Sequence, residues 1–386
     1  MVFASLILLP PALQCRLHCN PGFVSDLPPI ITCVDGNYEP YRPQEFTCQK
    51  AVALIVPKTG QMEVFGEDSK CNQVIRNIPS LTLAGHSVDL LDNQLIIGAS
   101  SIDGESWKYL SLWKPRDGLL ANPWTETKTL GSNGPQGHLS FVYGKDLIFL
   151  GGETGTQAIL QNGRTENGEW NVLRLTWKNG TSFDVVPKDS CLVKVNSYKF
   201  AILGGQDASG GQITNTVLMI NMKEQSVEKL GILAYRRMKH ACALFPDPSP
   251  DIDAKLLVLV TGGVSDDGDF KDEIYDLNDR SSRTLDSFMN VRRTQHQMIA
   301  LGTNVFALGG QHYIDGTSVD TIEKFDRDLE SWVTHSSRLK SNVTSGLAVT
   351  ALPLSAVSCN QGCKCGVNSE TRIIGGDEAE VMIFCS

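Results

Sequence analysis

Short apolar runs that end in a pair of glycines recur through the middle of the chain. The runs are LIFL, FAIL, LLVLVT and VFAL. Each run is continuous rather than alternating, which is typical of a strand buried on both faces. Two glycines are expected where such a strand ends close to neighbouring backbone, because a Cβ would clash there or because φ must be positive. The pairs are Gly151-Gly152, Gly204-Gly205, Gly262-Gly263 and Gly309-Gly310.

Each repeat predicts four strands, as residues 136–186 illustrate. QGHLSFVYGK gives a first strand, DLIFLGG a buried second strand, VLRLTW a third and TSFDVV a fourth. Successive glycine pairs are 53, 58 and 47 residues apart, a period in the range of propeller blades and longer than that of helical solenoids. Upstream, LIIGAS (95–100) keeps one glycine and ALIVPKTG (53–60) is a degenerate copy. The pattern therefore predicts six blades.

This diglycine pattern resembles the kelch repeat, whose blades form six-bladed β-propellers. The resemblance covers about residues 51–353 and is specific in the four diglycine repeats. The first copy starts at its second strand, whereas SNVTSGLAVTALP (341–353) looks like an orphan first strand. Pairing the two would close the ring and remove its free edges. We expect an all-β fold, with a six-bladed kelch-type β-propeller over residues 50–353 closed by a C-terminal strand.

Length and charge limit the remaining classes. A chain of 386 residues has room for one large repeat domain and small modules at its ends. A net charge of −9 argues against a nucleic-acid partner, because phosphate binding needs a basic surface. No stretch reaches the roughly 20 apolar residues of a membrane helix, so we expect no membrane span. Residues 1–14 contain an apolar stretch without a positive n-region, which fits either a secretion signal or the ragged start of an incomplete chain.

The 11 cysteines are concentrated at the two ends. Dense cysteines in short segments predict disulfide-stapled modules from an oxidising compartment, and hence an extracellular protein. The sparse central ones, Cys71, Cys191 and Cys242, are expected to be buried thiols that behave as small hydrophobes. A zinc site is the rival interpretation for the C-terminal group, although no histidine lies nearby at ligand spacing. The sequence leaves open the pairing of Cys15, Cys33, Cys359, Cys363, Cys365 and Cys385.

Residues 15–49 resemble part of a sushi (complement-control) module. The segments CNPGF and IITC, a GNY turn and a closing cysteine follow in that family's order. The resemblance implies a disulfide between Cys19 and Cys48, in a small disulfide-rich β module at the N-terminus. The family's first cysteine and about the first third of the module are missing here, and Cys15 resembles the extra cysteine of six-cysteine variants.

Residues 354–386 form a cysteine-rich linker followed by CGVNSETRIIGGDEAEV (365–381), which resembles the activation junction of trypsin-like serine proteases. The resemblance implies cleavage between Arg372 and Ile373, with Cys365 as the cysteine that tethers the propeptide. The chain ends 13 residues after Ile373, so the catalytic serine, histidine and aspartate of that family are absent from it. We therefore expect no enzyme activity and no cofactor.

Four histidines recur near the starts of the inner strands, and they invite a metal hypothesis because histidine is the commonest metal ligand. The alternative, which we favour, is that each histidine satisfies backbone groups within its own blade, since a repeated position does the same task each time. We accordingly expect no bound metal. The four are His86, His138, His240 and His296.

Charged residues flank the same strands and form the candidate binding loops. In an up-and-down blade, the loops after the second and fourth strands emerge on one face, so we expect a mosaic of acids and bases there, partly paired with each other. Many of the acids lie beside glycine, where they could act only as turn formers. The bases are Arg236, Arg237, Lys239, Arg292, Arg293, Arg338 and Lys340, and the acids are Asp103, Glu153, Asp207, Asp266, Asp267 and Asp315.

Two glycosylation sequons occur, at Asn179 and Asn342, and an exposed sequon is usable in a secreted chain. The leading hypothesis is a secreted, non-catalytic scaffold that binds an extracellular protein or glycan through propeller loops, as the regulatory portion or a truncated form of a mosaic serine protease. The alternative is the N-terminal part of an active trypsin-like zymogen whose catalytic domain is missing from this chain. A copper-radical oxidase is disfavoured because the required cysteine and tyrosine pattern is absent. An intracellular ubiquitin-ligase adaptor is disfavoured by the cysteine-rich ends.

Overall fold

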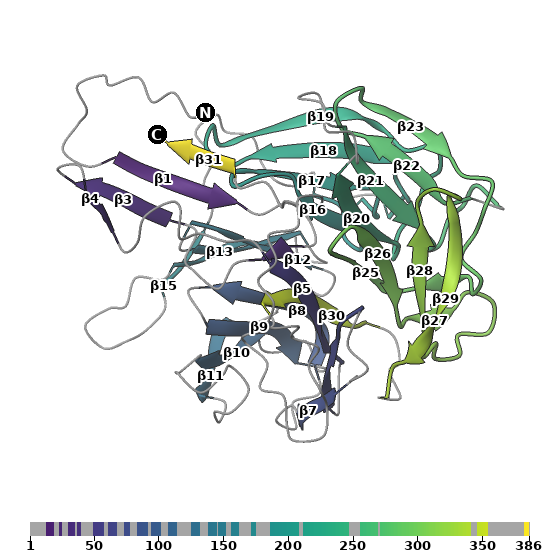
Figure 1. Ribbon diagram of the computed structural model, residues 1–386, viewed down its shortest axis with the longest axis horizontal. Helices are drawn as coiled ribbons and strands as arrows, with labels where there is room; N and C mark the ends of the chain where they lie inside the picture. Colours follow the sequence, from purple (N-terminus) through teal and green to yellow (C-terminus); the bar gives the residue numbers. More distant parts are fainter. Residues whose placement is uncertain are drawn as a thin grey trace, which may run out of the picture.

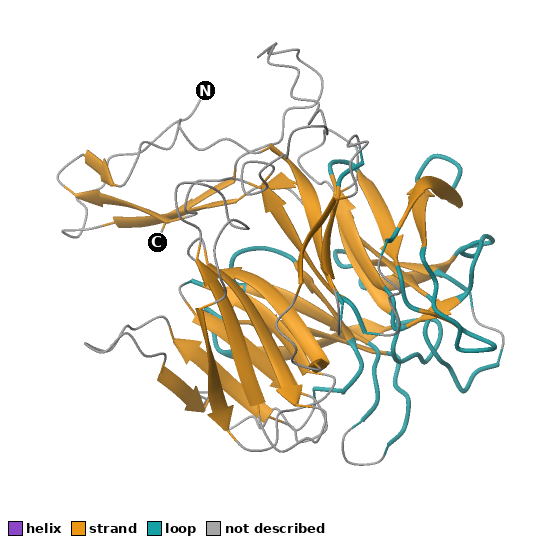
Figure 2. Ribbon diagram, turned by 90° about the horizontal axis from the view of Figure 1, so that it is seen from below, coloured by secondary structure: helices purple, strands orange, loops and turns teal. Residues whose placement is uncertain are grey.

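The described part of the chain is all-β, and Figure 2 draws strands and loops without a helix. Among these residues no helix is long and apolar enough to cross a membrane. The computed structural model describes residues 13–18, 23–24, 30–34, 37–39, 49–57, 61–67, 73–77, 83–91, 94–101, 107–113, 125–131, 138–144, 146–151, 156–161, 171–174, 186–207, 211–246, 255–268, 271–340, 346–353 and 382–385.

Each glycine pair belongs to one four-stranded antiparallel sheet, and these sheets are the blades of a propeller-like arrangement (Figure 1). We call them the first to fourth diglycine blades. The first contains β12 (His138–Tyr143), β13 (Asp146–Gly151), β14 (Thr156–Gln161) and β15 (Asn171–Arg174), and the second β16 (Cys191–Lys194), β17 (Lys199–Leu203), β18 (Thr216–Asn221) and β19 (Ser226–Ile232). The third contains β20 (Ala241–Pro246), β21 (Leu256–Thr261), β22 (Glu273–Asp276) and β23 (Ser281–Thr284), and the fourth β25 (Gln297–Leu301), β26 (Asn304–Leu308), β28 (Thr321–Asp326) and β29 (Ser331–Arg338).

Four blades of this kind are detected, whereas the sequence predicted six. The two upstream sheets lack the glycine pair, and one of them is irregular. The regular one has four strands, β8 (Leu83–Leu91), β9 (Gln94–Ser101), β10 (Trp107–Trp113) and β11 (Thr125–Gly131). The irregular one has five strands, β2 (Phe23–Val24), β5 (Gln49–Val56), β6 (Gln61–Phe65), β7 (Gln73–Asn77) and β30 (Ala348–Pro353).

The pairing expected between the C-terminal strand and the first apolar run is confirmed. β30 runs antiparallel to β5, with Ala348 opposite Val56 and Pro353 opposite Ala51. Two segments almost 300 residues apart in the sequence therefore share one sheet, so β5 is covered on the edge that the sequence left open.

A separate sheet contains both ends of the chain, with the strand order β31 (Met382–Cys385), β1 (Leu13–His18), β3 (Ile30–Val34) and β4 (Asn37–Glu39). These strands lie at the left of Figure 1, beside the propeller. The C-terminal strand is thus part of the N-terminal sheet, an association that the sequence did not indicate. A two-stranded ladder, β24 (Arg293–Thr294) with β27 (Gln311–His312), completes the described strands.

The hydrophobic core lies between neighbouring sheets rather than in one centre, because a blade buries both of its faces. Phe141 of β12 stacks on Phe200 of β17, with ring centroids 3.9 Å apart. Further round, Phe306 of β26 meets Phe65 of β6 edge to face at 5.2 Å. This explains why the second strand of each blade is a continuous apolar run.

A disulfide between Cys191 and Cys242 joins the inner strands of the second and third diglycine blades. The prediction that these two cysteines are buried thiols was wrong. Both residues are buried, but the inner strands β16 and β20 converge so that the Cα atoms lie 5.9 Å apart, within reach of a bridge. Cys71 lies outside the described residues.

Candidate binding face

Successive diglycine blades are joined by backbone hydrogen bonds around their inner ends. We call the residues that lead into each inner strand the lead-in segment. Lys239 N–H donates to the Asp189 carbonyl at 2.8 Å, and Gln295 N–H donates to the Lys239 carbonyl at 2.8 Å. These three residues have the same positive φ of 54°, which non-glycine residues adopt only where the surroundings hold them. The continuation to Gly346, whose N–H lies 3.4 Å from the Gln295 carbonyl, extends this belt to the segment before β30.

The glycine pairs are required by the contact between one blade and the next lead-in segment. A Cβ on Gly262 would lie 2.3 Å from the carbonyl oxygen of Arg293 and 2.8 Å from the ring of His296. Gly263 donates its N–H to the same Arg293 carbonyl at 3.0 Å. Both glycines also have positive φ. The sequence argument for close backbone approach is therefore confirmed, and the approaching partner belongs to the following blade.

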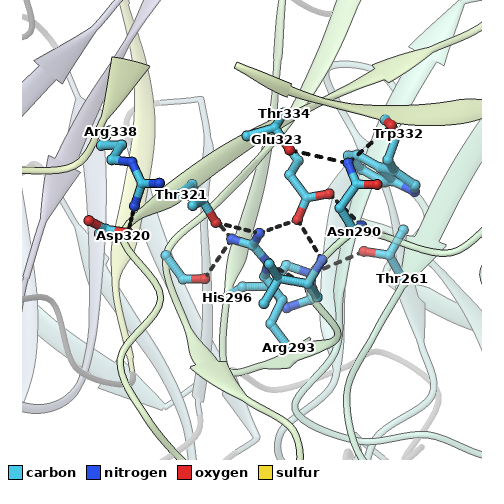
Figure 3. Close-up of polar contacts among 12 residues, drawn as sticks. Thr261, Asn290, Arg293, His296, Asp320, Thr321, Glu323, Trp332, Thr334 and Arg338 are labelled. Atoms are coloured by element: carbon cyan, nitrogen blue, oxygen red, sulfur yellow. Dashed lines mark hydrogen bonds and ion pairs between the residues drawn. The ribbon is translucent and has the colours of Figure 1, made fainter. Parts of the chain in front are cut away.

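The arginines of two lead-in segments are buried in ion pairs. Arg237 Nη2 lies 2.6 Å from Glu273 Oε1, and both side chains are fully buried. Arg293 makes the same pair with Glu323 in the next blade, and Figure 3 shows its guanidinium between Glu323 and Thr321. Each glutamate also accepts a backbone N–H of its lead-in segment, as Glu323 does from Asn290 at 2.6 Å. A buried charge paired in this way anchors the segment.

Arg237 and Arg293 therefore do not belong to the surface mosaic in which the sequence analysis placed them. Charged residues in loops are usually exposed, but these two side chains have no exposed surface. Burial lowers the pKa of the Arg293 guanidinium, and the facing Glu323 carboxylate opposes that shift.

The described histidines bind across blades, so the expectation of contacts within their own blade was wrong. His296 Nε2 lies 3.0 Å from Thr261 Oγ1 of the preceding blade. His138 Nε2 lies 3.2 Å from Ser87 Oγ on β8, in another sheet. Within the described residues neither ring nitrogen of His240 has a hydrogen-bond partner, and its ring packs against Gly204. Only the backbone of His86 is described.

Burial keeps the inner histidines neutral. It lowers the pKa of His240 to about 3, with a further contribution from the nearby Arg237 charge. The pKa of His296 is also lowered well below its ordinary value, by burial and by Arg293. Across the described ranges, no group of three His, Cys, Asp or Glu residues could hold a metal ion.

The lead-in segments and the loops after the second strands emerge on one face, which we call the loop face. In the third diglycine blade Arg236 Nη2 lies 2.6 Å from Asp267 Oδ1, and Asp267 also accepts the Arg236 backbone N–H at 2.7 Å. The Arg236 guanidinium lowers the pKa of the Asp267 carboxyl. In the fourth blade β24 pairs with β27, which joins the same two segments. For these loops the expected geometry, including pairing between acid and base, is present.

The individual acids of the candidate binding loops differ in their surroundings. Asp207 and Asp266 are exposed on the loop face. Asp315 accepts the backbone N–H of Thr317 at 2.9 Å and its hydroxyl at 2.7 Å, so it acts as a turn former. The following positions lie outside the described residues: Asp103, Glu153, Cys19, Cys48, Asn179, Asn342, Arg372 and Ile373.

A pocket opens on the loop face between the third and fourth diglycine blades, with an empty volume of about 320 Å³ that includes open solvent. Phe288 and Met289 give it apolar walls, and the Arg292 guanidinium lies 4.5 Å from the centre of the Phe288 ring. The residues that line it are Gly262, Gly263, Asp272, Phe288, Met289, Arg292, Arg293 and Tyr313.

Asp272 is the buried acid of this pocket. It accepts the Gly262 N–H at 3.3 Å and the indole N–H of Trp332 at 3.0 Å. Trp332 belongs to the fourth blade, so this hydrogen bond crosses between blades. Burial raises the pKa of Asp272 to about 6, although Arg237 and both donors act in the opposite direction.

The sequence analysis missed the apolar residues of this region. Tyr313 is 38% exposed and Ile314, the next residue, is 82% exposed. The available signal was an apolar pair inside the polar turn QHYIDGT, which is unusual because large apolar side chains are rarely left in water together.

No family model matches the chain, and no curated protein matches it. The kelch, sushi and protease resemblances therefore stay proposals, and the argument for function depends on the geometry of the loop face.

Proposed function

We propose that this chain is an extracellular, non-catalytic binding scaffold in which a kelch-type propeller presents its loop face to a protein or a glycan. The observation that carries the proposal is the pocket between the third and fourth diglycine blades, with exposed apolar and charged side chains around it. Binding sites are concave, largely apolar and equipped with a few polar groups, and this pocket has all three properties. The disulfide between Cys191 and Cys242 supports an oxidising compartment.

We further propose that the two upstream sheets complete a closed, six-bladed ring. Contacts between inner strands support this arrangement, since β30 lies against β8 and β25, and β8 lies against β12. A second support is Glu63 on β6, whose two carboxylate oxygens accept the Lys340 backbone N–H at 3.0 and 2.8 Å. This repeats the role of Glu323 in the fourth diglycine blade.

The terminal segments extend the proposal. The sushi-like segment would carry the disulfide between Cys19 and Cys48, the sequons at Asn179 and Asn342 would carry glycans, and Arg372-Ile373 would be a cleavage site. The alternative function is the N-terminal part of a trypsin-like zymogen. The sequence of the native secreted product distinguishes the two, because the zymogen requires a protease domain that follows Ile373.

The experiment that tests the binding scaffold compares two charge reversals on opposite faces. The purified chain is applied to arrays of extracellular proteins and glycans, and each ligand is then measured with Asp266→Lys and Glu224→Lys. Both residues are exposed, but Glu224 lies in the turn between β18 and β19, at the other end of the blades. We expect saturable binding that Asp266→Lys weakens and Glu224→Lys leaves unchanged. No ligand on either array, or equal effects of the two variants, would contradict the proposal.

A further inference from the structure

The turn after β27 holds two apolar side chains in water. Among the described residues Ile314 is the most exposed large hydrophobic, at 82%, and Tyr313 precedes it at 38%. Other exposed apolar side chains, Ile232, Leu329 and Val333, are single residues on outer strands or their turns. Single exposed apolar residues are ordinary, whereas neighbouring ones beside a pocket mark an interaction site.

The turn is rigidly held, so the exposed pair is presented in one conformation. His312 N–H donates to the Thr317 carbonyl at 2.8 Å, and Gly316 N–H donates back to the His312 carbonyl at 2.9 Å. Asp315 accepts two further hydrogen bonds from Thr317 inside the turn. Tyr313 N–H donates to the Arg292 carbonyl at 3.0 Å, which ties the turn to the lead-in segment beside the pocket. A pre-organised surface loses less entropy on binding.

The chemistry of the pocket specifies what fits next to this turn. Tyr313, Phe288 and Met289 line it, so they suit an apolar side chain. The guanidinium of Arg292 lies over the Phe288 ring, and a stacked guanidinium keeps its N–H groups at the ring's periphery, where a carboxylate binds well. Asp315 does not compete for this position, because its carboxylate is engaged within its own turn.

We propose that Tyr313, Ile314 and the adjacent pocket anchor a protein partner, one that presents an apolar side chain next to a carboxylate. This inference rests on the proposed binding function and narrows it to one site and one class of ligand. A glycan is the weaker candidate, because the isoleucine side chain offers no hydrogen bond and no ring face, and Arg292 covers the Phe288 ring on which a sugar would stack. Tyrosine and arginine are enriched among the residues that dominate the energy of protein interfaces.

The test uses a random peptide library displayed on phage, selected against the immobilised full-length chain. We expect the enriched peptides to share an apolar residue beside Asp or Glu. Ile314→Ser and Arg292→Ser should each weaken binding of a purified peptide about tenfold, the effect of losing one dominant interface residue. Leu329→Ser is the matched control, because Leu329 is 73% exposed in the turn between β28 and β29, away from the pocket. It should leave the affinity unchanged, and all three variants should keep the wild-type Tm.

The outcomes separate this inference from the broader proposal. Peptide binding that survives Ile314→Ser and Arg292→Ser, or a library that yields no enriched peptide, overturns the anchor. Glycan binding that is sensitive to Asp266→Lys but insensitive to Ile314→Ser overturns the protein partner and leaves the binding scaffold intact. Absence of both peptide and glycan binding overturns both proposals.

Discussion

Two contacts between neighbouring sheets use the same backbone geometry with different chemistry. Between the third and fourth diglycine blades, Gly262 packs against the Arg293 carbonyl and the His296 ring. Between the fourth blade and the sheet of β5, Gly309 packs against Leu347, with a would-be Cβ 2.3 Å from its Cδ1. Leu347 thus takes the place of His296, and three residues earlier the sequence has Thr344 in place of arginine.

The comparison separates what the fold requires from what it only uses. Glycine is common to both contacts, and so is a buried glutamate that accepts a lead-in N–H, Glu323 in one case and Glu63 in the other. The arginine and the histidine are present in only one of them. We infer that close backbone approach builds the ring, while the polar side chains add strength and pH dependence to individual contacts.

Removing the arginine of the polar contact should have the largest effect. Arg293→Met leaves the fully buried Glu323 carboxylate without its cation, and breaking a buried pair costs about 3–5 kcal/mol. The free energy of unfolding, measured by urea denaturation, should fall by that amount. The double variant Arg293→Met with Glu323→Leu should recover most of the loss. A single variant as stable as the wild type would show that the pair is dispensable.

Opening the disulfide should weaken a contact that has a covalent link as well as a histidine. Cys191 and Cys242 are 51 residues apart, and closing a loop of that length stabilises a protein by up to about 4 kcal/mol through the unfolded chain. The variant Cys191→Ser with Cys242→Ser should therefore lower the Tm, and dithiothreitol should lower the wild-type Tm in the same way. An unchanged Tm under reduction would contradict the assignment.

Glycine substitutions should distinguish a crowded position from an open one. Gly262→Ala requires the Arg293 carbonyl to move, and we expect a loss of about 2–3 kcal/mol, more than the roughly 1 kcal/mol that positive φ alone costs. Gly268 also has positive φ, at 79°, but no atom lies within 4 Å of its would-be Cβ. Gly268→Ala should therefore show only the smaller loss in the same denaturation assay. Equal losses at the two positions would remove the packing argument.

The polar contact should also weaken in acid. The pKa of His240 is lowered from 6.5 to about 3 in the folded state, so the unfolded chain binds the proton first as the pH falls. Stability from this group is complete above pH 6.5 and declines below it, by about 2 kcal/mol at pH 5. His240→Phe should reduce the difference in unfolding free energy between pH 7 and pH 5 by that amount. Asp272, whose pKa is raised to about 6, has the opposite sign and remains in both proteins. The account fails here if the variant and the wild type show the same pH dependence.

The parts of the fold that could be predicted from the sequence are those written in continuous apolar runs and glycine spacing. The buried second strands and the pairing of β30 with β5 follow from such patterns. The disulfide could not be predicted, because it depends on which residues of β16 and β20 face each other. Nor could the burial of Arg237 and Arg293, since a charged residue in a loop is ordinarily exposed. The pocket combines Phe288, Arg292 and Tyr313 only after two blades pack together.

Ring closure is the central claim, and one pair of truncations tests it most directly. A chain ending after Lys340 loses β30, whereas a chain ending after Leu354 keeps it and loses the same downstream residues. We predict that urea unfolding remains cooperative in the longer chain and that the shorter chain loses its cooperative transition, because β5 is left without its partner strand. An unchanged transition in the chain ending after Lys340 would contradict the closed ring.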